Sequence, residues 1–192
     1  IDRGPASVAR KWGHAGREAD GRLAAVATIS DLLASGAKPL ALTLAISAPI
    51  SSSVEEVRSI IEGFYTTCSQ YGAAFVGGDT KMGEWNLVSS GIGVLDAEIH
   101  QRQKGRPGDF LVVTGPVGQF LLSSLALLND RPRASRALAA QRYLSFPEVS
   151  ATCAAWVQSN LSVRSATDAS DGLFDALVNV VAPDHGFEIV VE

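Results

Sequence analysis

Helix-like and strand-like apolar patterns alternate along the first half of this 192-residue chain. Between 20 and 35 the apolar residues recur at helical spacing, and the glycine that follows is a natural helix end. The near-continuous apolar run over 39–48 predicts a strand covered on both faces. Serines followed by glutamates predict a second helix over 51–71, and strands are expected over 73–76 and 85–95. This alternation predicts an α/β or α+β protein.

A polar, turn-rich segment over 101–108 divides the chain, and we place a domain boundary within it. The expected units are a strand-rich N-terminal domain over 1–103 and a C-terminal α/β domain over 104–192. We expect both to be incomplete, because the chain starts without methionine and stops in a strand-like run. The patterns of the second unit predict strands over 110–114 and 163–166 and helices over 119–128, 137–143, 148–159 and 172–181.

Composition excludes several classes of protein. Hydrophobic residues make up 46% of the chain and charged residues 19%, which is typical of a globular protein. Each half carries 8 basic and 10 acidic residues, so neither half offers a basic face for nucleic acid. We expect neither a signal peptide nor a membrane span, because this sequence does not start with a basic stretch followed by an apolar one, and its longest uncharged run contains glycines and a proline. Cys68 and Cys153 lie far apart in helix-like segments, which predicts reduced core thiols in a cytoplasmic protein.

Aspartates are the main candidates for chemistry, because the common nucleotide-binding loops and a histidine-based site have little support in this sequence. Asp79 follows two glycines at the expected end of a strand, where open sheets commonly hold ligands. A tight turn explains the same residues about as well. Asp31 lies on a helix side with small neighbours that leave room for an ion, although a solvated helix face gives the same pattern.

A third acidic group places Asp168 and Asp171 on either side of Ser170, directly before an expected helix. Oxygen ligands of this kind suit Mg²⁺, which usually takes one or two carboxylates together with substrate phosphate oxygens. Several such groups can hold the metals that neutralise a nucleoside triphosphate during phosphoryl transfer. The alternative is that Ser170 or Asp171 only caps the helix.

These motifs resemble a superfamily of ATP-using enzymes that includes aminoimidazole ribonucleotide synthetase, thiamine-monophosphate kinase, selenophosphate synthetase and the hydrogenase-maturation carbamoyl dehydratase. Residues 21–40 are similar to the family's long helix and its Gly-Ala-x-Pro ending, and 77–80 to its Gly-Gly-Asp-Thr. Residues 106–118 resemble the opening of its second domain, and 168–173 the Asp-x-Ser-Asp-Gly-Leu of the thiamine-monophosphate kinase branch. The resemblance implies a two-domain aminoimidazole ribonucleotide synthetase-like fold that dimerises through its N-terminal domain.

The resemblance also assigns roles to residues, with Mg²⁺ and ATP as cofactors. The metal ligands that it implies are Asp31, Asp79, Asp168 and Asp171. The nucleotide contacts that it implies are Gly78, Asp79, Arg102 and Ser170. Of these residues, Asp79 and Asp171 would be catalytic.

The implied activity is transfer of a phosphoryl group from ATP to a small-molecule acceptor. That acceptor is thiamine monophosphate in the branch whose acidic motif this chain shares. Residues 21–40, 78–81 and 114–116 look more like the hydrogenase-maturation branch, so ATP-dependent activation of an amide or carboxamide stays an alternative. A non-catalytic nucleotide-binding dimerisation module is another. We expect a cytoplasmic homodimer with neither nucleic acid nor membrane as a partner.

Overall fold

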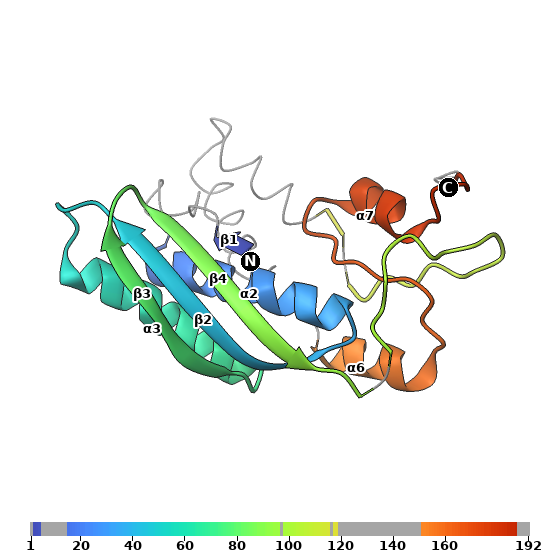
Figure 1. Cartoon of the computed structure of the whole chain (residues 1–192), viewed down its shortest axis with the longest axis horizontal. Coiled ribbons are helices and arrows are strands. Elements are labelled where there is room, and N and C mark those ends of the chain that lie inside the picture. Colours follow the sequence, from blue (N-terminus) through green and yellow to red (C-terminus); the bar gives the residue numbers. More distant parts are fainter. Residues whose placement is uncertain (1, 5–14, 97, 116, 119–150, 188–192) are drawn as a thin grey trace, which may run out of the picture.

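The computed structural model describes residues 2–4, 15–96, 98–115, 117–118 and 151–187 (Figure 1). Its elements are, in chain order, β1 (Asp2–Gly4), α2 (Glu18–Ala34), β2 (Lys38–Ala48), α3 (Val54–Gln70), β3 (Ala74–Met82), β4 (Asn86–Val94), α6 (Ala151–Asn160) and α7 (Leu173–Val180). The helices expected over 119–128 and 137–143 lie outside the described residues. The expected mixture of helices and strands is confirmed.

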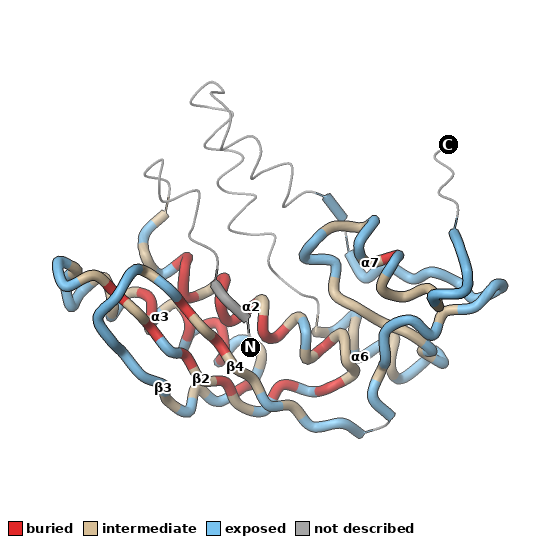
Figure 2. Tube along the Cα trace, turned by 45° about the horizontal axis from the view of Figure 1, so that its top comes forward, coloured by how far each residue is buried: buried red, intermediate tan, exposed pale blue. Residues whose placement is uncertain are grey.

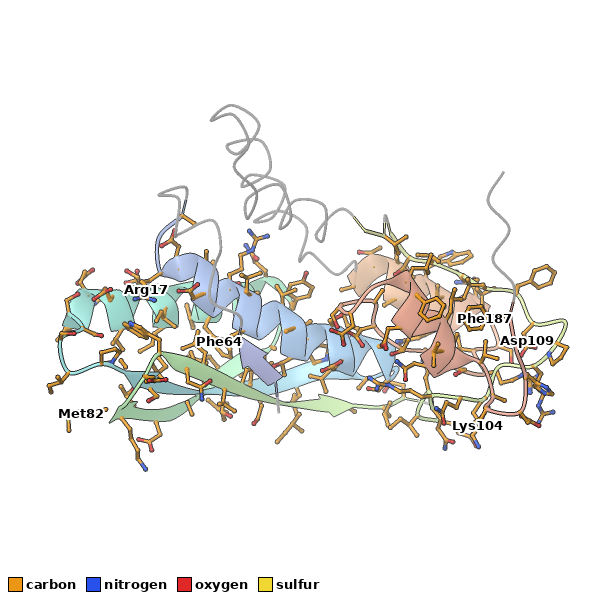
Figure 3. The ribbon with its side chains drawn as sticks, turned by 90° about the horizontal axis from the view of Figure 1, so that it is seen from above. Arg17, Phe64, Met82, Lys104, Asp109 and Phe187 are labelled. Carbon is orange, nitrogen blue, oxygen red and sulfur yellow. The ribbon has the colours of Figure 1, made fainter. Side chains whose placement is uncertain are left out.

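One four-stranded sheet holds the strands in the order β1-β4-β2-β3. Strand β4 pairs antiparallel with both β1 and β2, whereas β2 and β3 are parallel. Parallel neighbours need a crossover, and α3 provides it between β2 and β3. Helices α2 and α3 lie on the same face of the sheet (Figure 1, Figure 3). The N-terminal part of the chain is therefore one layer of helices on one layer of strands.

The core lies between this sheet and the two helices. Ile29 of α2, Leu42 of β2 and Phe64 of α3 are fully buried there. The ring of Phe64 meets that of Phe75 edge-on, with 5.2 Å between the ring centroids. Edge-to-face contact is a favoured arrangement of aromatic rings and adds to the free energy gained by burying them. These apolar contacts hold the helical layer on the sheet.

Two glycines let the helices α2 and α3 cross backbone to backbone. A Cβ atom on Gly21 would lie 1.9 Å from the Ile60 carbonyl oxygen, and one on Gly63 would lie 2.0 Å from the Glu18 carbonyl oxygen. Both distances are far below any contact that real atoms make. Neither position can take another residue unless the helices separate.

The other face of the sheet is exposed, which corrects the expectation that β2 is covered on both faces. Leu42 and Leu44 point to the helices and are buried, whereas Leu40 is 54% exposed. The exposed face continues on β4 with Ile92 and Val94. The expectation was wrong because α2 and α3 share one face, so the described part of the chain puts no helix on the other. Figure 2 shows buried residues on the helices and the adjoining strands and exposed residues along β3.

Strand β3 continues past its expected end at residue 76. The pairing with β2 steps from Leu42 opposite Phe75 to Leu44 opposite Gly78, so β3 carries one extra residue. Gly77 has a φ of 123°, a conformation that favours glycine. This β-bulge keeps the strand paired instead of ending it. Asp79 therefore lies within a strand and not in a turn behind one.

The chain after β4 forms fewer regular elements than expected. Helices α6 and α7 confirm the described parts of the helices expected over 148–159 and 172–181. Residues 110–114, expected as a strand, form none, and no described segment pairs with their backbone. The strand expected over 163–166 is reduced to a single bridge between Gln101 and Ser165. Within the described residues, no helix has the length and apolar character needed to cross a membrane.

The two cysteines occupy different environments. Cys68 is fully buried in the core, and this burial raises the pKa of its thiol to about 11. Cys153 is exposed on α6, which corrects the expectation that both thiols are core residues. The apolar neighbours of Cys153 in the sequence belong to a helix with no buried residue among those described.

Candidate functional site

Three of the predicted site residues meet in the structure: Arg102, Asp168 and Ser170. Arg102 Nη2 lies 3.7 Å from Asp168 Oδ1, and the Asp168 side chain is only 11% exposed. Ser170 donates to Asp168 Oδ2 from its backbone N–H at 3.3 Å and also from its hydroxyl. The Thr167 hydroxyl donates to Oδ1 at 3.4 Å. The Asp168 carboxylate is thus held by its own loop on one side and by a guanidinium on the other.

Backbone pairing on both sides of Arg102 places this residue beside Asp168. The Gln101 carbonyl accepts a hydrogen bond from the Ser165 hydroxyl at 2.9 Å. The Gln103 N–H donates to the Asn179 carbonyl at 2.7 Å. Gln103 has a φ of 58°, so the chain turns sharply after Arg102. The backbone that carries the Arg102 guanidinium is therefore hydrogen-bonded to two other segments, at Ser165 and at Asn179.

A tight turn follows the Arg102 segment, and an ion pair ties this turn to the segment that leads to Asp168. The Asp109 N–H donates to the Arg106 carbonyl at 3.0 Å, and Gly108 has a φ of 90°, as expected for a type II turn. Asp109 Oδ2 accepts from the Arg106 N–H at 2.8 Å and from Arg164 Nε at 2.9 Å. Arg164 stands on the segment that leads to Asp168. The sequence does not predict this pair, since no pattern links residues 55 positions apart.

Asp171 lies in the turn between Asp168 and α7 and is exposed. The Gly172 N–H closes this turn by donating to the Ala169 carbonyl at 3.1 Å. Gly172 is itself the N-cap of α7, and no side chain caps the helix. The alternative in which Ser170 or Asp171 is only a helix cap is therefore wrong. The oxygens of Asp171 face solvent.

Asp31 and Asp79 do not join this group in the described chain. Asp79 lies opposite Ala45 on the open face of the sheet, is 62% exposed and forms an ion pair with Lys81 at 3.2 Å. Asp31 is exposed on α2, which covers the other face. The described residues contain no group of three or more acidic, histidine or cysteine side chains able to hold a metal. The four predicted metal ligands thus stand in three separate places.

Gly78 has a structural requirement in addition to its predicted contact with a nucleotide. A Cβ atom at this position would lie 1.7 Å from the Leu44 carbonyl oxygen. A side chain would therefore separate β3 from β2. Glycine at this position is therefore required for the pairing of β3 with β2, independently of any contact with a nucleotide.

A hollow of about 1450 Å³ adjoins Asp168. It lies between the C-terminal part of α2 and the chain after β4, and its wall includes Ser30, Phe110 and Leu177. Ser30 directly precedes Asp31, so α2 reaches the same hollow as Asp168. The hollow exceeds the common range of ligand sites, about 300–1,000 Å³.

The groups around Asp168 fit a magnesium ion in chemical type. The carboxylates of Asp168 and Asp171 and the hydroxyls of Thr167 and Ser170 are hard oxygen donors, which Mg²⁺ prefers. Arg102 supplies a positive charge suited to phosphate oxygens. These are the chemical types of group that a phosphate and its metal ion require.

Comparison with known proteins identifies the N-terminal part. The family model described as AIR synthase related protein, N-terminal domain, matches residues 8–95. Residues 8–95 belong to the AIR synthase related family. The match spans all of α2, β2, α3, β3 and β4. The family resemblance predicted from the motifs is confirmed.

Proteins similar to this chain include thiamine-monophosphate kinases. The one from Methanospirillum hungatei is 33% identical over 179 residues, which are 88% of this chain and 55% of that protein. The crystal structure of thiamine monophosphate kinase from Aquifex aeolicus has a TM-score of 0.71 at 25% identity, over 82% of this chain and 53% of that one. A crystal structure of a HypE–HypF complex has a TM-score of 0.53 at 29% identity, over 59% and 41% respectively. The chain spans about half the length of the relatives named here.

Proposed function

We propose that the chain is part of an ATP-dependent phosphotransferase that converts thiamine monophosphate to thiamine diphosphate. The observation that carries the proposal is the contact of Arg102 with Asp168 in a loop braced by Ser170. A cation and a carboxylate side by side suit a phosphate group and its metal ion. The 33% identity with a thiamine-monophosphate kinase over 88% of the chain supports this acceptor.

In this proposal Arg102 and Ser170 contact the phosphates, and Asp168 and Asp171 hold Mg²⁺. The metal, when bound, neutralises the charge of the triphosphate. Phosphoryl transfer depends mostly on positioning and charge, so the site needs no side-chain base. The Ser170 hydrogen bonds hold Asp168 in one orientation, and the exposed Asp171 is able to adjust to the ligand.

Asp31, Gly78 and Asp79 complete the proposed site only in an assembled protein. The described residues of one chain leave Asp31 and Asp79 on different layers, away from the Arg102 contact. A further surface has to bring these groups together. We propose that Asp31 and Asp79 then act as metal ligands, with Asp79 and Asp171 as the catalytic pair and the Gly78 backbone beside the nucleotide.

We propose that residues 1–103 form one domain and residues 104–192 a second. The open face of the sheet in the first domain supports a homodimer. Leu40, Ile92 and Val94 on this face are 54%, 67% and 48% exposed. Burying such side chains against a second copy is favourable, and paired copies are the commonest assembly of soluble proteins. We place this homodimer in the cytoplasm. Analytical ultracentrifugation checks it: a dimer that Ile92→Glu dissociates supports it, and a monomer at all concentrations contradicts it.

A second candidate function is ATP-dependent activation of an amide or carboxamide. The observation that favours it is the TM-score of 0.53 and 29% identity with a chain of the HypE–HypF complex. Both candidates use the same nucleotide site and differ in the acceptor. A nucleotide-binding module without catalysis would bind ATP and leave it intact.

Phosphorus NMR of the chain with ATP, Mg²⁺ and thiamine monophosphate separates these candidates. Joint appearance of ADP and thiamine diphosphate is the expected result. ADP formed only with carbamoyl or amide acceptors supports the second candidate. Bound but unconverted ATP indicates the non-catalytic module, and an unbound nucleotide contradicts all three. Asp168→Asn is the control, because it keeps the size of the side chain and removes the charge beside Arg102.

A further inference from the structure

The ion pair between Asp109 and Arg164 connects the two segments that form the Arg102–Asp168 contact. Asp109 closes the turn behind the Arg102 segment, and Arg164 stands on the segment that leads to Asp168. Figure 3 places Asp109 at the end of the molecule that also carries Lys104, opposite the end marked by Met82. The pair lies far from the apolar core.

The position of this pair does not suit a role in stability. The side chains of Asp109 and Arg164 are 36% and 48% exposed. Exposed ion pairs contribute only about 0–1 kcal/mol to folding, since water screens the charges. The geometry is nevertheless well defined, because Asp109 Oδ2 receives two donors within 2.9 Å.

The hydrogen bonds around the pair form a closed circuit. Ser165, the neighbour of Arg164, donates from its hydroxyl to the Gln101 carbonyl at 2.9 Å, next to Arg102. The Lys104 N–H donates back to the Ser165 hydroxyl at 3.4 Å. From there the chain leads through the turn to Asp109 and across the ion pair to Arg164. The Ser165 hydroxyl and the ion pair are the side-chain links that close this circuit.

We propose that Asp109 and Arg164 are positioning residues that hold Arg102 at the distance from Asp168 which a phosphate with its metal requires. This inference rests on the proposed function, because only that function supplies a nucleotide for Arg102 and Asp168 to bind. Without the pair, the Asp109 turn loses its link to Arg164, and among the described residues only the hydrogen bonds of Ser165 and Ala166 to the Arg102 segment remain to fix the separation of the two charged groups. Small errors in such positions weaken binding and catalysis.

The test compares Arg164→Gln, Arg164→Lys and Asp109→Asn with Arg58→Gln as the matched control. Arg58 forms an exposed ion pair with Glu55 on α3, so its loss removes a surface ion pair distant from the site. Calorimetric titration with Mg²⁺ and AMPPCP gives the dissociation constant of the nucleotide. Amide hydrogen exchange at Lys104 and thermal unfolding are measured on the same proteins.

We expect Arg164→Gln and Asp109→Asn each to weaken AMPPCP binding by up to about fivefold, the upper end of what the loss of one exposed ion pair brings. The double variant is no weaker than either single one, because both remove the same link. Exchange at Lys104 becomes faster, while the melting temperature stays at that of Arg58→Gln. Arg164→Lys retains the charge and recovers most of the affinity.

Binding and exchange that match those of Arg58→Gln overturn the inference. A fall in the melting temperature that accompanies the loss of affinity also overturns the inference, because it indicates that the ion pair only stabilises the fold. An unsubstituted chain that does not bind AMPPCP contradicts the proposed function instead. The exchange at Lys104 then decides by itself whether the ion pair holds the Arg102 segment.

Discussion

The sheet with its two helices and the chain after β4 are built on different principles. Nearly all described buried apolar residues lie between Ala19 and Leu87, and after β4 only Leu177 is described as buried. The region after β4 exposes large apolar side chains instead, with Phe110 at 96% and Phe174 at 68%. Its defined contacts are hydrogen bonds and ion pairs, together with the edge-on contact between the rings of Phe174 and Phe187. Stability is thus concentrated in the first region, and the candidate chemistry is concentrated in the second.

Because of this separation, we expect substitutions in the first region to change the free energy of unfolding and substitutions in the second to change ligand binding. Removing a core side chain leaves a cavity and lowers the free energy of unfolding. Removing a polar group from an exposed loop changes what the loop binds and hardly affects unfolding. The predictions below test that division, and each could also contradict it.

The sharpest contrast is between Phe64→Ala and Phe174→Ala. Phe64 is fully buried, so its truncation should lower the free energy of unfolding by about 3–5 kcal/mol. Phe174 is 68% exposed, and its truncation should cost less than about 1 kcal/mol. Urea denaturation of both variants measures the difference. Similar losses in the two variants would show that the second region carries a share of the core.

Gly78→Ala tests whether a glycine of the site belongs to the sheet. Because the added Cβ meets the Leu44 carbonyl, we expect a loss of about 1–3 kcal/mol in the free energy of unfolding. Gly115→Ala is the control, since a Cβ there has open space. A variant that unfolds like the unsubstituted chain but binds ATP weakly would assign Gly78 to the nucleotide alone.

Asp171→Asn should separate function from stability in the second region. We expect at least a tenfold loss of Mg²⁺-dependent ATP turnover, equivalent to about 1.4 kcal/mol of transition-state stabilisation. Unfolding should not change, because the side chain is exposed and does not cap α7. Steady-state kinetics and urea denaturation measure the two effects. Unchanged kinetics here and in Asp79→Asn would remove the metal assignment.

The buried thiol of Cys68 gives the stability of the core a pH dependence. Burial raises the pKa of Cys68 from 9.0 to about 11, so the folded state keeps its proton when the unfolded state has lost it. Stability is therefore unaffected below pH 9 and falls between pH 9 and pH 11. The loss should be about 1 kcal/mol at pH 10. Unfolding measured against Cys68→Ala isolates it, and parallel pH profiles would contradict it.

The sequence predicted the first region well, because periodic apolar patterns are local. The spacing over 20–35 and the run over 39–48 correspond to α2 and β2 within a few residues. Strand β3 was predicted too short, because Asp79 and Lys81 break the apolar pattern of an exposed edge strand. Charged residues are common on such edges. No local pattern reveals that a bulge at Gly77 lets pairing continue.

The second region was predicted less well, because its contacts are not local. Asp168 and Ser170 were found from a short motif whose members hydrogen-bond to each other. The pairing of Asp109 with Arg164 crosses 55 residues and leaves no trace in the sequence pattern. The run over 110–114 has the composition of a strand, but a strand also needs a partner, and the described chain provides none.

The order of the strands also fixes the order in which the sheet can be completed during synthesis. Strand β1 precedes the other three strands of the sheet in the chain, yet its neighbour is β4, the last of the four. The unit from β2 through α3 to β3 can pair as soon as it emerges, since its strands are adjacent. Strand β1 has to wait for β4, so of these four strands the first to be made is the last to be paired.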